Sequence, residues 1–457
     1  MKMTAAEIAA ACGGTLLCGD PQAVVTSFFT DSREGTPGGL FVPIKGERTD
    51  AHVFIDATLQ AGAAGSFTQG PGTLRDDRVL IRVDDTLRAL QDTARAWRQR
   101  FSLPVVGITG SVGKTTTKEM VALALSSAFC VMRTRGNQNS QVGLPLTLFQ
   151  LSEEHDCAVV EMGMSNFGEM GRLSEIACPT MAVMTNIGVS HIAYLKTQEN
   201  ILAEKLHITD RFTPEQPVFI NGDDKLLRGL VGQVPLRLIT FGLSEGCEYR
   251  AINVQQDETG VRFTLQTPTG CLPVSVPAPG LHNVRNAAVS IAVAETMGAD
   301  PVKAAKALAS YEPPAMRQQI LHAGDVTVVD DCYNASPDSM RSSLQLLRDM
   351  PVMGRRIAVL GDMLELGAES HSGHYSVGQA CVRDGVDVLL CVGPESAAIC
   401  EGARDGHTSM AVRHEESNET VIAWLQENLK PGDTVLVKGS RGMHMEEIVR
   451  ALLQRNA

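Results

Sequence analysis

Residues 105–117 constrain the fold of this chain more than any other stretch. They read Val-Val-Gly-Ile-Thr-Gly-Ser-Val-Gly-Lys-Thr-Thr-Thr, an apolar run followed by a glycine-rich turn and then by a lysine and threonines. Glycine lets backbone N–H groups approach phosphate oxygens, and the N-terminus of a helix favours an anion. The lysine can reach the outer phosphates, and a hydroxyl can bind Mg²⁺. The stretch therefore predicts a buried strand, a polyphosphate-binding loop and the start of a helix.

The loop differs from the strict P-loop pattern in one place. That pattern has a glycine where this chain has Ile108, and the first glycine of the turn is Gly110 instead. An ordinary strand-to-helix turn is the alternative interpretation, but strand, turn, lysine and helix follow in the order that phosphate binding requires. The nucleotide-binding residues expected in this loop are Gly110, Ser111, Val112, Gly113, Lys114, Thr115 and Thr116.

The composition excludes several classes of protein. A length of 457 residues suggests about three domains of common size. The net charge is −12 without a basic tract, so nucleic acid and anionic membranes are poor partners. The 11 cysteines form no C-x-x-C pair, which argues for reduced thiols rather than a zinc ribbon or a disulfide framework. With no signal peptide and no apolar run long enough to span a bilayer, we expect a cytoplasmic protein without a membrane partner.

The order of the apolar runs predicts an α/β protein of three domains. Residues 1–84 alternate short strands, helices and turns, which is typical of a small α/β domain. Residues 85–312 predict a parallel sheet with helices on both faces, extended by antiparallel strands at 236–277. A Tyr-Glu-Pro-Pro segment at 311–314 predicts a hinge. Residues 313–457 predict a Rossmann-like domain that lacks G-x-G-x-x-G and so is not expected to bind a dinucleotide.

Three polar side chains follow successive strands of the predicted central sheet. Glu161 ends a buried strand, His191 follows the next strand, and Lys205 lies on the helix after it. Because ligands bind at the carboxyl ends of parallel strands, we expect these side chains around the phosphate site, with the carboxylate on Mg²⁺. Taken singly, each has a structural alternative: a carboxylate facing water, a structural histidine and a solvated lysine.

The order of these motifs resembles that of the Mur ligase family. The central motifs are Thr-Gly-x-x-Gly-Lys-Thr-Thr at 109–116, Glu-Met-Gly at 161–163, Thr-Asn-Ile-Gly-x-x-His at 185–191, Lys205, and Gly-Leu-His-Asn-x-x-Asn at 280–286. The others are Asp-Ser-Arg at 31–33, Asp-Asp-Cys-Tyr-Asn-Ala-Ser-Pro-x-Ser at 330–339, Gly-Asp-Met-Leu-Glu-Leu-Gly at 361–367 and Lys-Gly-Ser-Arg-Gly-Met at 438–443. The resemblance covers essentially the whole chain.

The resemblance implies an ATP-dependent amide ligase of peptidoglycan precursor synthesis, and hence of cell-wall biogenesis, cell shape and cell division. The motifs of the third domain are similar to those of the family member that joins D-alanyl-D-alanine to UDP-N-acetylmuramoyl-tripeptide. That reaction passes through an acyl phosphate and yields the UDP-linked pentapeptide, ADP and phosphate. The resemblance implies ATP and Mg²⁺ as cofactors and a monomer in the cytoplasm.

Other functions stay open as alternatives. A sister Mur ligase adds diaminopimelate or lysine to the UDP-linked dipeptide, but it usually carries Asp-Asn-Pro-Arg in its third domain, which this chain lacks. Folylpolyglutamate synthase shares the ATPase core without a UDP-binding first domain. A nucleotide-hydrolysing switch protein is disfavoured by the Asp-Ser-Arg motif at 31–33 and by the missing guanine-specificity motif.

The resemblance also implies roles for individual residues. The expected catalytic residues are Lys114, Glu161, His191 and Lys205. The expected metal ligands are Thr115, Glu161, His191 and a carbamylated Lys205. The expected further ATP contacts are His282, Asn283 and Asn286 near the adenine, Asp331 at the ribose and Arg317 at the phosphates. The expected substrate contacts are Ser32, Arg33 and Lys45 near UDP, Asn137 and Asn139 near the middle of the precursor, and Ser440 and Arg441 near the dipeptide.

The chain departs from the usual family pattern at a few positions. Ser140 stands where an asparagine is usual, and Leu206 stands where a glutamate usually follows the lysine. Met316, just before Arg317, stands where glycine is usual, which places a side chain at the expected hinge.

Overall fold

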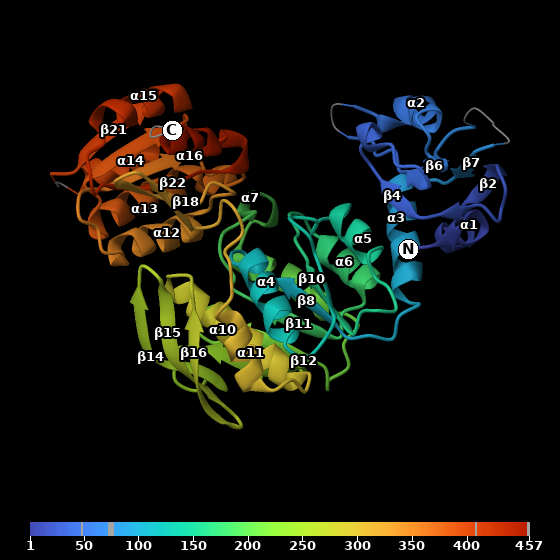
Figure 1. Cartoon of the computed structure of the whole chain (residues 1–457), viewed down its shortest axis with the longest axis horizontal. Helices are drawn as coiled ribbons and strands as arrows, with labels where there is room; N and C mark the ends of the chain where they lie inside the picture. Colours follow the sequence, from blue (N-terminus) through green and yellow to red (C-terminus); the bar gives the residue numbers. More distant parts are fainter. Residues whose placement is uncertain (47–48, 72–76, 407–408, 455–457) are drawn as a thin grey trace.

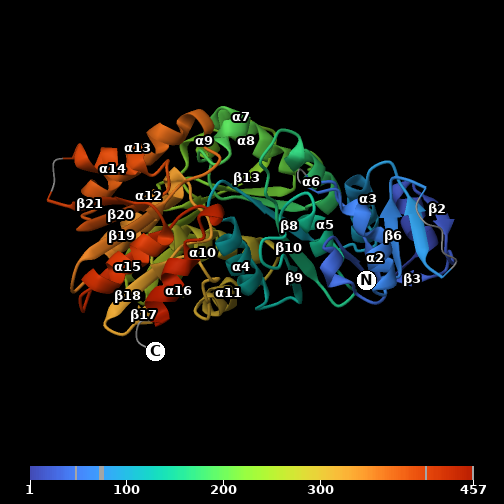
Figure 2. The ribbon, with the colours of Figure 1, turned by 90° about the horizontal axis from the view of Figure 1, so that it is seen from above.

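Each of the three main sheets forms the core of one lobe in the computed structural model, which describes residues 1–46, 49–71, 77–406 and 409–454. The N-terminal lobe comprises β1 to β7, the central lobe β8 to α11, and the C-terminal lobe β17 to α16. Figures 1 and 2 show the outer lobes at opposite ends of the central one. The predicted three-domain α/β class is confirmed.

The N-terminal lobe is built on a small sheet of strand order β2-β7-β6-β5-β4, beside a short β1–β3 pair. Its first helix begins where predicted, because the Thr4 hydroxyl and the Glu7 carboxylate form a capping box. The strands are β1 (Met3–Thr4), β2 (Thr15–Cys18), β3 (Val24–Val25), β4 (Ser27–Phe29), β5 (Gly39–Phe41), β6 (Gly65–Thr68) and β7 (Val79–Arg82). The helices are α1 (Ala5–Cys12), α2 (Ile55–Gln60) and the 3₁₀ turns η1 (Ser32–Glu34) and η2 (Ala51–Phe54).

Helix α3 (Thr86–Arg98) connects the N-terminal and central lobes. Asp85 caps it by accepting a hydrogen bond from the Arg88 backbone N–H. Its apolar face, which includes Leu90 and Trp97, is buried in the same apolar cluster as α1 and one face of the central sheet. The helix therefore belongs to the packing of both lobes.

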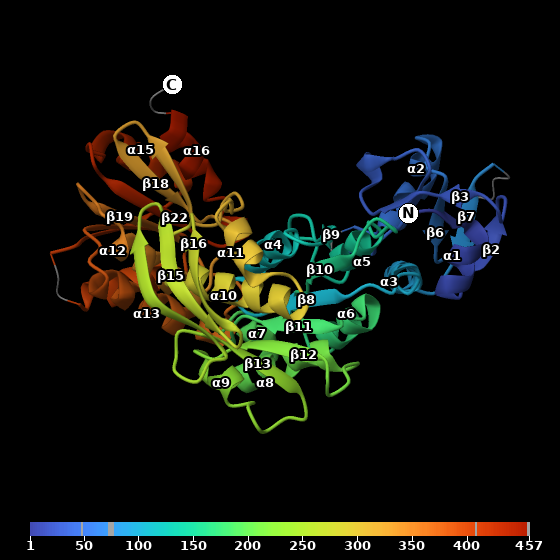
Figure 3. The same cartoon turned by 60° about the horizontal axis from the view of Figure 1, so that its bottom comes forward.

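The central sheet has nine strands in the order β16-β15-β14-β13-β12-β11-β8-β10-β9. Its strands are β8 (Val105–Thr109), β9 (Val131–Arg133), β10 (Cys157–Glu161), β11 (Met181–Met184), β12 (Pro217–Asn221), β13 (Arg237–Gly242), β14 (Tyr249–Asp257), β15 (Gly260–Thr267) and β16 (Gly270–Val276). Strands β8 to β13 are parallel, and β14, β15 and β16 extend the sheet antiparallel to one another, as Figure 3 shows. The predicted antiparallel extension is confirmed for β14 to β16 and wrong for β13, which pairs parallel with β12.

Apolar clusters cover both faces of the central sheet, which explains the near-continuous apolar strands. Along β8, Val105 faces one cluster, while Val106 and Ile108 face the other together with α4 and α10. The helices are α4 (Lys114–Leu125), α5 (Gly143–Leu148), α6 (Glu169–Ala177), α7 (Ile192–Leu195), α8 (Gln198–Leu206), η3 (His207–Thr209), α9 (Lys225–Arg228), α10 (Leu281–Thr296) and α11 (Pro301–Leu308).

The C-terminal lobe has a six-stranded sheet of order β17-β18-β22-β19-β20-β21, parallel except for β17. The strands are β17 (Gln319–Ala323), β18 (Val326–Asp330), β19 (Arg356–Gly361), β20 (Val388–Val392), β21 (Ala411–Glu415) and β22 (Thr434–Lys438). The helices are α12 (Pro337–Asp349), η4 (Gly367–Glu369), α13 (Ser370–Arg383), α14 (Ala397–Arg404), α15 (Asn418–Asn428), η5 (Arg441–Met443) and α16 (Glu446–Gln454). Within the described ranges, no helix is both long and apolar enough to cross a bilayer.

Candidate active site

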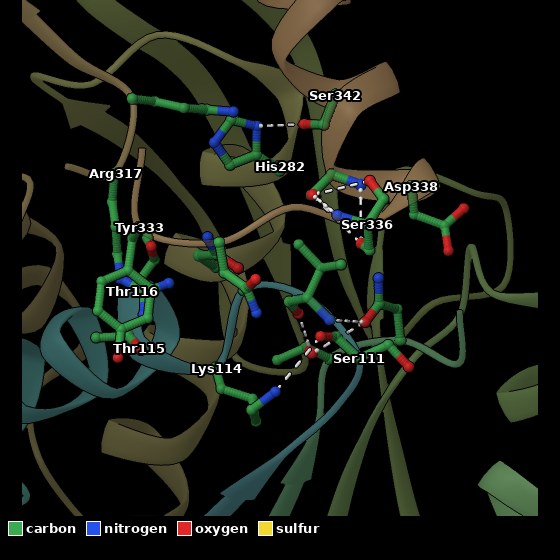
Figure 4. A pocket seen from close by; sticks show the side chains of 18 of the residues that line it. Ser111, Lys114, Thr115, Thr116, His282, Arg317, Tyr333, Ser336, Asp338 and Ser342 are labelled. Atoms are coloured by element: carbon green, nitrogen blue, oxygen red, sulfur yellow. Dashed lines mark hydrogen bonds between the residues drawn. The ribbon is translucent and has the colours of Figure 1, made fainter. Parts of the chain in front are cut away.

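A cavity of about 1140 Å³ lies between the central and C-terminal lobes. It contains the predicted phosphate loop on one wall and the start of the C-terminal lobe on the other (Figure 4). The predicted site residues that line it are Ser111, Val112, Gly113, Lys114, Thr115, Thr116, Asn139, Glu161, His191, His282, Asn283, Asn286, Arg317 and Asp331. Residues from segments far apart in the sequence thus meet around one space.

The phosphate loop has the conformation that its glycines allow. Gly110 has a φ of 149°, and a side chain there would collide with the hydroxyl of Thr185. Helix α4 begins at Lys114, so its free N–H groups face the cavity. The Lys114 ammonium donates to the Gly110 carbonyl at 2.8 Å and to the Ser111 carbonyl at 3.4 Å. A strongly anionic ligand can replace these weak internal acceptors.

The segment directly after β11 holds the phosphate loop in place through hydrogen bonds. The Thr185 hydroxyl donates to the Val112 carbonyl at 2.6 Å, and the Val112 N–H donates to the Asn186 side-chain oxygen at 2.8 Å. The Gly188 N–H donates to the Ser111 hydroxyl at 2.8 Å. These bonds fix the loop as an open cradle, which is pre-organisation for phosphate.

Glu161 is a buried carboxylate at the same sheet edge as the phosphate loop. It pairs with Ile108 across the β8–β10 ladder, and 1% of its surface is exposed. Its Oε1 accepts a hydrogen bond from the Asn139 side-chain amide at 2.6 Å, while its Oε2 is buried without a hydrogen-bond partner among the described residues. An unpaired buried carboxylate oxygen beside a phosphate cradle has the chemistry of a Mg²⁺ ligand. The residues present therefore fit a magnesium ion here.

His191 lies at the boundary between the two lobes. Its Nδ1 is 2.9 Å from Oε2 of Glu365 in the C-terminal lobe, and both residues have a φ of 64°. The hydrogen bond from His191 lowers the pKa of Glu365. Across the described ranges, no group of three or more His, Cys, Asp or Glu side chains is arranged to hold a metal. The expected second metal site at His191 therefore stays a prediction.

Lys205 is buried behind the cavity rather than on its wall. Only 2% of its surface is exposed, and its ammonium donates no hydrogen bond within the described part of the chain. Burial, and then the positive charge of Lys114, lower its pKa well below the ordinary value. Its neighbour Glu204 does not pair with Lys205 but accepts hydrogen bonds from backbone N–H groups at the start of α6.

The start of α10 forms the far end of the cavity. The Asn286 side-chain oxygen accepts a hydrogen bond from the Thr117 hydroxyl at 3.0 Å, and the Asn286 amide donates to the Asn283 side-chain oxygen at 3.3 Å. His282 Nδ1 is 3.4 Å from the Ser342 hydroxyl of α12, the bond drawn at the top of Figure 4. The three expected adenine-side residues, His282, Asn283 and Asn286, are thus brought together at one place.

His282 is expected to remain neutral at neutral pH, because burial lowers its pKa from 6.5 to about 4. The unfolded chain takes up a proton on this side chain between these two values, whereas the folded protein does not. The free energy of unfolding should therefore fall as the pH drops through this window, by on the order of 2 kcal/mol relative to a His282→Gln variant. Urea unfolding of both proteins at about pH 7 and about pH 5 measures the difference. An equal change in the free energy of unfolding of the two proteins between these pH values would contradict the lowered pKa of His282.

The C-terminal lobe supplies Arg317, Tyr333 and Asp331 to the cavity. The Arg317 guanidinium stacks over the Tyr333 ring, with its Cζ 3.9 Å from the ring centroid, and the pair is visible at the left of Figure 4. Met316 adopts a φ of 61°, the left-handed conformation that the glycine usual at this position would adopt without strain. The sequence did not single out Tyr333, although it lies within the 330–339 motif.

Contacts between the lobes surround the cavity. Besides the pair of His191 and Glu365, the Val189 N–H donates to Asp338 at 3.3 Å, and the Gln256 amide donates to Asp349 at 2.8 Å. Asp338 is labelled on the right of Figure 4, and α7 lies beside the C-terminal lobe in Figure 1. The central and C-terminal lobes are thus in direct contact, through the segment after β11 and through β14.

Other predicted residues do not line this cavity. Gly110, the first glycine of the loop, is not among the residues that line the cavity, while Ser32, Arg33 and Lys45 belong to the N-terminal lobe, where Arg33 pairs with Asp31. Asn137 is exposed on the central lobe. The buried Ser440 hydroxyl accepts a hydrogen bond from the Leu364 N–H at 2.9 Å, and Arg441 lies 3.2 Å from Glu446. Their expected roles toward the precursor and the dipeptide stay predictions.

Comparisons with known proteins identify the family. Residues 108–294 match the Mur ligase middle domain, and residues 316–441 match the Mur ligase glutamate ligase domain. The chain is 36% identical to the UDP-N-acetylmuramoyl-tripeptide–D-alanyl-D-alanine ligase of Bacillus subtilis (strain 168) over 459 residues, covering 99% of each.

Solved structures agree with the sequence comparison. A crystal structure of MurF from Acinetobacter baumannii matches with a TM-score of 0.91 at 29% identity, covering 99% of both chains. MurF ligase from Thermotoga maritima in complex with ADP matches with a TM-score of 0.83 at 29% identity, covering 94% of this chain and 98% of that one. The predicted resemblance is confirmed: the chain belongs to the Mur ligase family, among the UDP-N-acetylmuramoyl-tripeptide–D-alanyl-D-alanine ligases.

Proposed function

We propose that this protein uses ATP to join D-alanyl-D-alanine to UDP-N-acetylmuramoyl-tripeptide, giving the UDP-linked pentapeptide, ADP and phosphate in peptidoglycan precursor synthesis. The observation that carries the proposal is the cavity in which the phosphate loop of one lobe faces Arg317 and Asp331 of the other. Relatives that match over more than nine tenths of both chains carry the name of this ligase. The sister reaction with diaminopimelate or lysine is the alternative.

The chemistry follows from the poor reactivity of a carboxylate. The terminal carboxylate oxygen of the tripeptide attacks the γ-phosphorus of ATP, the bond to the bridging oxygen breaks, and ADP leaves. The amine nitrogen of the dipeptide then attacks the acyl carbon, a proton leaves the nitrogen, and phosphate departs with the C–O bonding pair. Phosphoryl transfer requires positioning and charge neutralisation more than covalent help. The α4 N-terminus and Lys114 supply both at the cavity wall.

Magnesium would be held mainly by Glu161, through its unpaired Oε2, and by the Thr115 hydroxyl at the start of α4. When bound, the ion neutralises charge on the phosphate oxygens. Asn139 keeps the Glu161 carboxylate in place through its 2.6 Å hydrogen bond. His191 is the proposed ligand of a second ion, for which it would exchange its contact with Glu365.

We also propose that Lys205 is carbamylated. Its neutral nitrogen attacks the carbon of CO₂, an N–C bond forms while the electron pair of one C=O π bond moves to oxygen, and a proton leaves the nitrogen for solvent, which yields a carbamate anion. Two observations support the modification: burial lowers the pKa of the amine well below its ordinary value, and the positive charge of Lys114 lowers this pKa further. The carbamate would convert this repulsion into an attraction. A ¹³C carbonyl resonance after exposure to ¹³CO₂, absent in Lys205→Met, is the expected signature.

The remaining assignments concern the substrates and the organisation of the chain. We propose that the domains are 1–84, 85–312 and 313–457, and that the protein acts as a monomer in the cytoplasm. The proposed UDP-binding residues are Ser32, Arg33 and Lys45. The proposed contacts to the rest of the substrates are Asn137 and Asn139 for the precursor and Ser440 and Arg441 for the dipeptide.

One assay tests the proposed function. The protein is incubated with ATP, Mg²⁺, UDP-N-acetylmuramoyl-tripeptide and one amine at a time, and phosphate release is followed together with the mass of the UDP-linked product. Release that requires D-alanyl-D-alanine and yields the pentapeptide is the expected result. Release that instead requires diaminopimelate or lysine with the dipeptide precursor would establish the sister reaction.

A further inference from the structure

A buried ion pair lies on the C-terminal side of the cavity. Lys438 ends β22, and Asp331 directly follows β18, the neighbouring parallel strand. The Lys438 ammonium is 2.6 Å from Oδ2 of Asp331 and donates to the Asn334 carbonyl at 3.0 Å. Only 2% of Lys438 and 7% of Asp331 are exposed. A buried pair of this kind is weak evidence for a purely stabilising role, because desolvation offsets much of its attraction.

Within the described ranges, the hydrogen bonds donated to the Asp331 carboxylate reach one of its two oxygens, Oδ2. The Ser343 hydroxyl of α12 donates to the same Oδ2 at 2.5 Å, and Ser343 itself is fully buried. In the described ranges no donor reaches Oδ1, although Asp331 lines the cavity. One carboxylate oxygen is therefore held from inside the lobe, and the other is left for a donor that enters the cavity.

The charges of the pair indicate what kind of donor fits. Lys438 compensates the negative charge of Asp331, so the cavity wall presents a hydrogen-bond acceptor without a net charge that would repel a nucleotide. Both groups also act on His282 in the opposite wall, where Asp331 raises and Lys438 lowers its pKa. The pair lies close to the adenine-side residues, because His282 Nδ1 is 3.4 Å from the hydroxyl of Ser342, the residue before Ser343. A sugar hydroxyl is a neutral donor of the required type.

We propose that Lys438 is a positioning residue for the nucleotide: together with Ser343 it holds Asp331 so that Oδ1 accepts a hydrogen bond from a ribose hydroxyl of ATP. Lys438 thereby sets the selectivity of the cavity for ribonucleotides over deoxyribonucleotides. This inference rests on the proposed function, in which the cavity binds ATP, and on the expected contact of Asp331 with the ribose.

Nucleotide selectivity tests the proposal. Phosphate release with the full set of substrates is measured with ATP, 2′-deoxyATP and 3′-deoxyATP for the wild type, Lys438→Met, Asp331→Asn and the double variant. The wild type should prefer ATP over at least one deoxynucleotide by about tenfold in kcat/KM, since a hydrogen bond to a charged group contributes at least that much. Lys438→Met should lose most of this preference, and in the Asp331→Asn background it should cause no further loss.

Controls separate positioning from a structural role. Lys430→Met removes an exposed lysine from the loop before β22 and should keep the wild-type preference. Ser343→Ala removes one hydroxyl and should reduce the preference partially, which keeps the proposal testable if Lys438→Met does not fold. A uniform loss of rate with all three nucleotides and an unchanged preference would show that Lys438 only supports the fold.

The outcome also distinguishes this inference from the proposed function. A wild-type enzyme that releases phosphate with D-alanyl-D-alanine but treats all three nucleotides alike would overturn the role of Lys438 and leave the ligase activity standing. A wild type without any ATP-dependent release would overturn the proposed function, and the positioning role with it.

Discussion

Replacing Lys114 with methionine is expected to lower kcat for phosphate release about 10²- to 10³-fold, the usual cost of removing one electrostatic contact to a transition state. The ammonium lies in the wall of the cavity, and within the described part of the chain it donates hydrogen bonds to the Gly110 and Ser111 carbonyls of the loop alone. Burial lowers its pKa, which the charge of Glu161 opposes. Because a buried ammonium carries a desolvation cost, the melting temperature should be unchanged or higher in Lys114→Met.

The measurement compares kcat, the dissociation constant for ATP and the melting temperature. Lys225→Met is the matched control, because Lys225 is exposed at the start of α9 in the same lobe and carries the same charge. The control should retain wild-type rates. A normal kcat for Lys114→Met would show that the γ-phosphate does not lie against Lys114. A large drop in melting temperature would show that this lysine has a structural role.

Replacing Glu161 with glutamine is expected to raise the Mg²⁺ concentration needed for half-maximal rate and to lower kcat by on the order of 10²-fold. The substitution is nearly isosteric, and the hydrogen bond from Asn139 to Oε1 can persist. What changes is the second oxygen, Oε2, which is buried without a hydrogen-bond partner among the described residues and would become an amide nitrogen. An amide NH₂ is a donor and does not bind a cation.

A magnesium titration of phosphate release checks this expectation. Glu153→Gln, an exposed position on the same lobe, removes the same charge away from the cavity and should follow the wild-type curve. The stability of Glu161→Gln should be equal to or above that of the wild type, because the buried charge is lost. An unchanged magnesium dependence would exclude Glu161 as a ligand.

The overall α/β organisation was predictable because it depends on local order. Strands buried on both faces have to be apolar throughout, and β8 and β10 carry such runs directly before the phosphate loop and Glu161. The direction of a strand depends on its neighbour, which a single segment does not encode. That is why β13 was wrongly grouped with the antiparallel extension, whereas β14 to β16 were not.

The candidate site was predictable where topology decides position. Parallel strands bring their carboxyl ends to one edge, so Glu161 and the phosphate loop meet whatever the details of packing. Contacts between lobes were not predictable in this way. The Glu365 partner of His191 is 174 residues away, and the Asp331 partner of Lys438 is 107 residues away. No local pattern marks such pairs.

The phosphate loop, its glycines and the order of strands and helices around it are properties of neighbouring residues, and the sequence alone was enough to assign them and the family. The orientation of Asp331 between Lys438 and Ser343, the unpaired oxygen of Glu161 and the burial of Lys205 were decided by tertiary packing. The physical reason is the range of the interactions: turn geometry and helix capping act within a few residues, whereas burial and charge pairing depend on segments that only folding brings together.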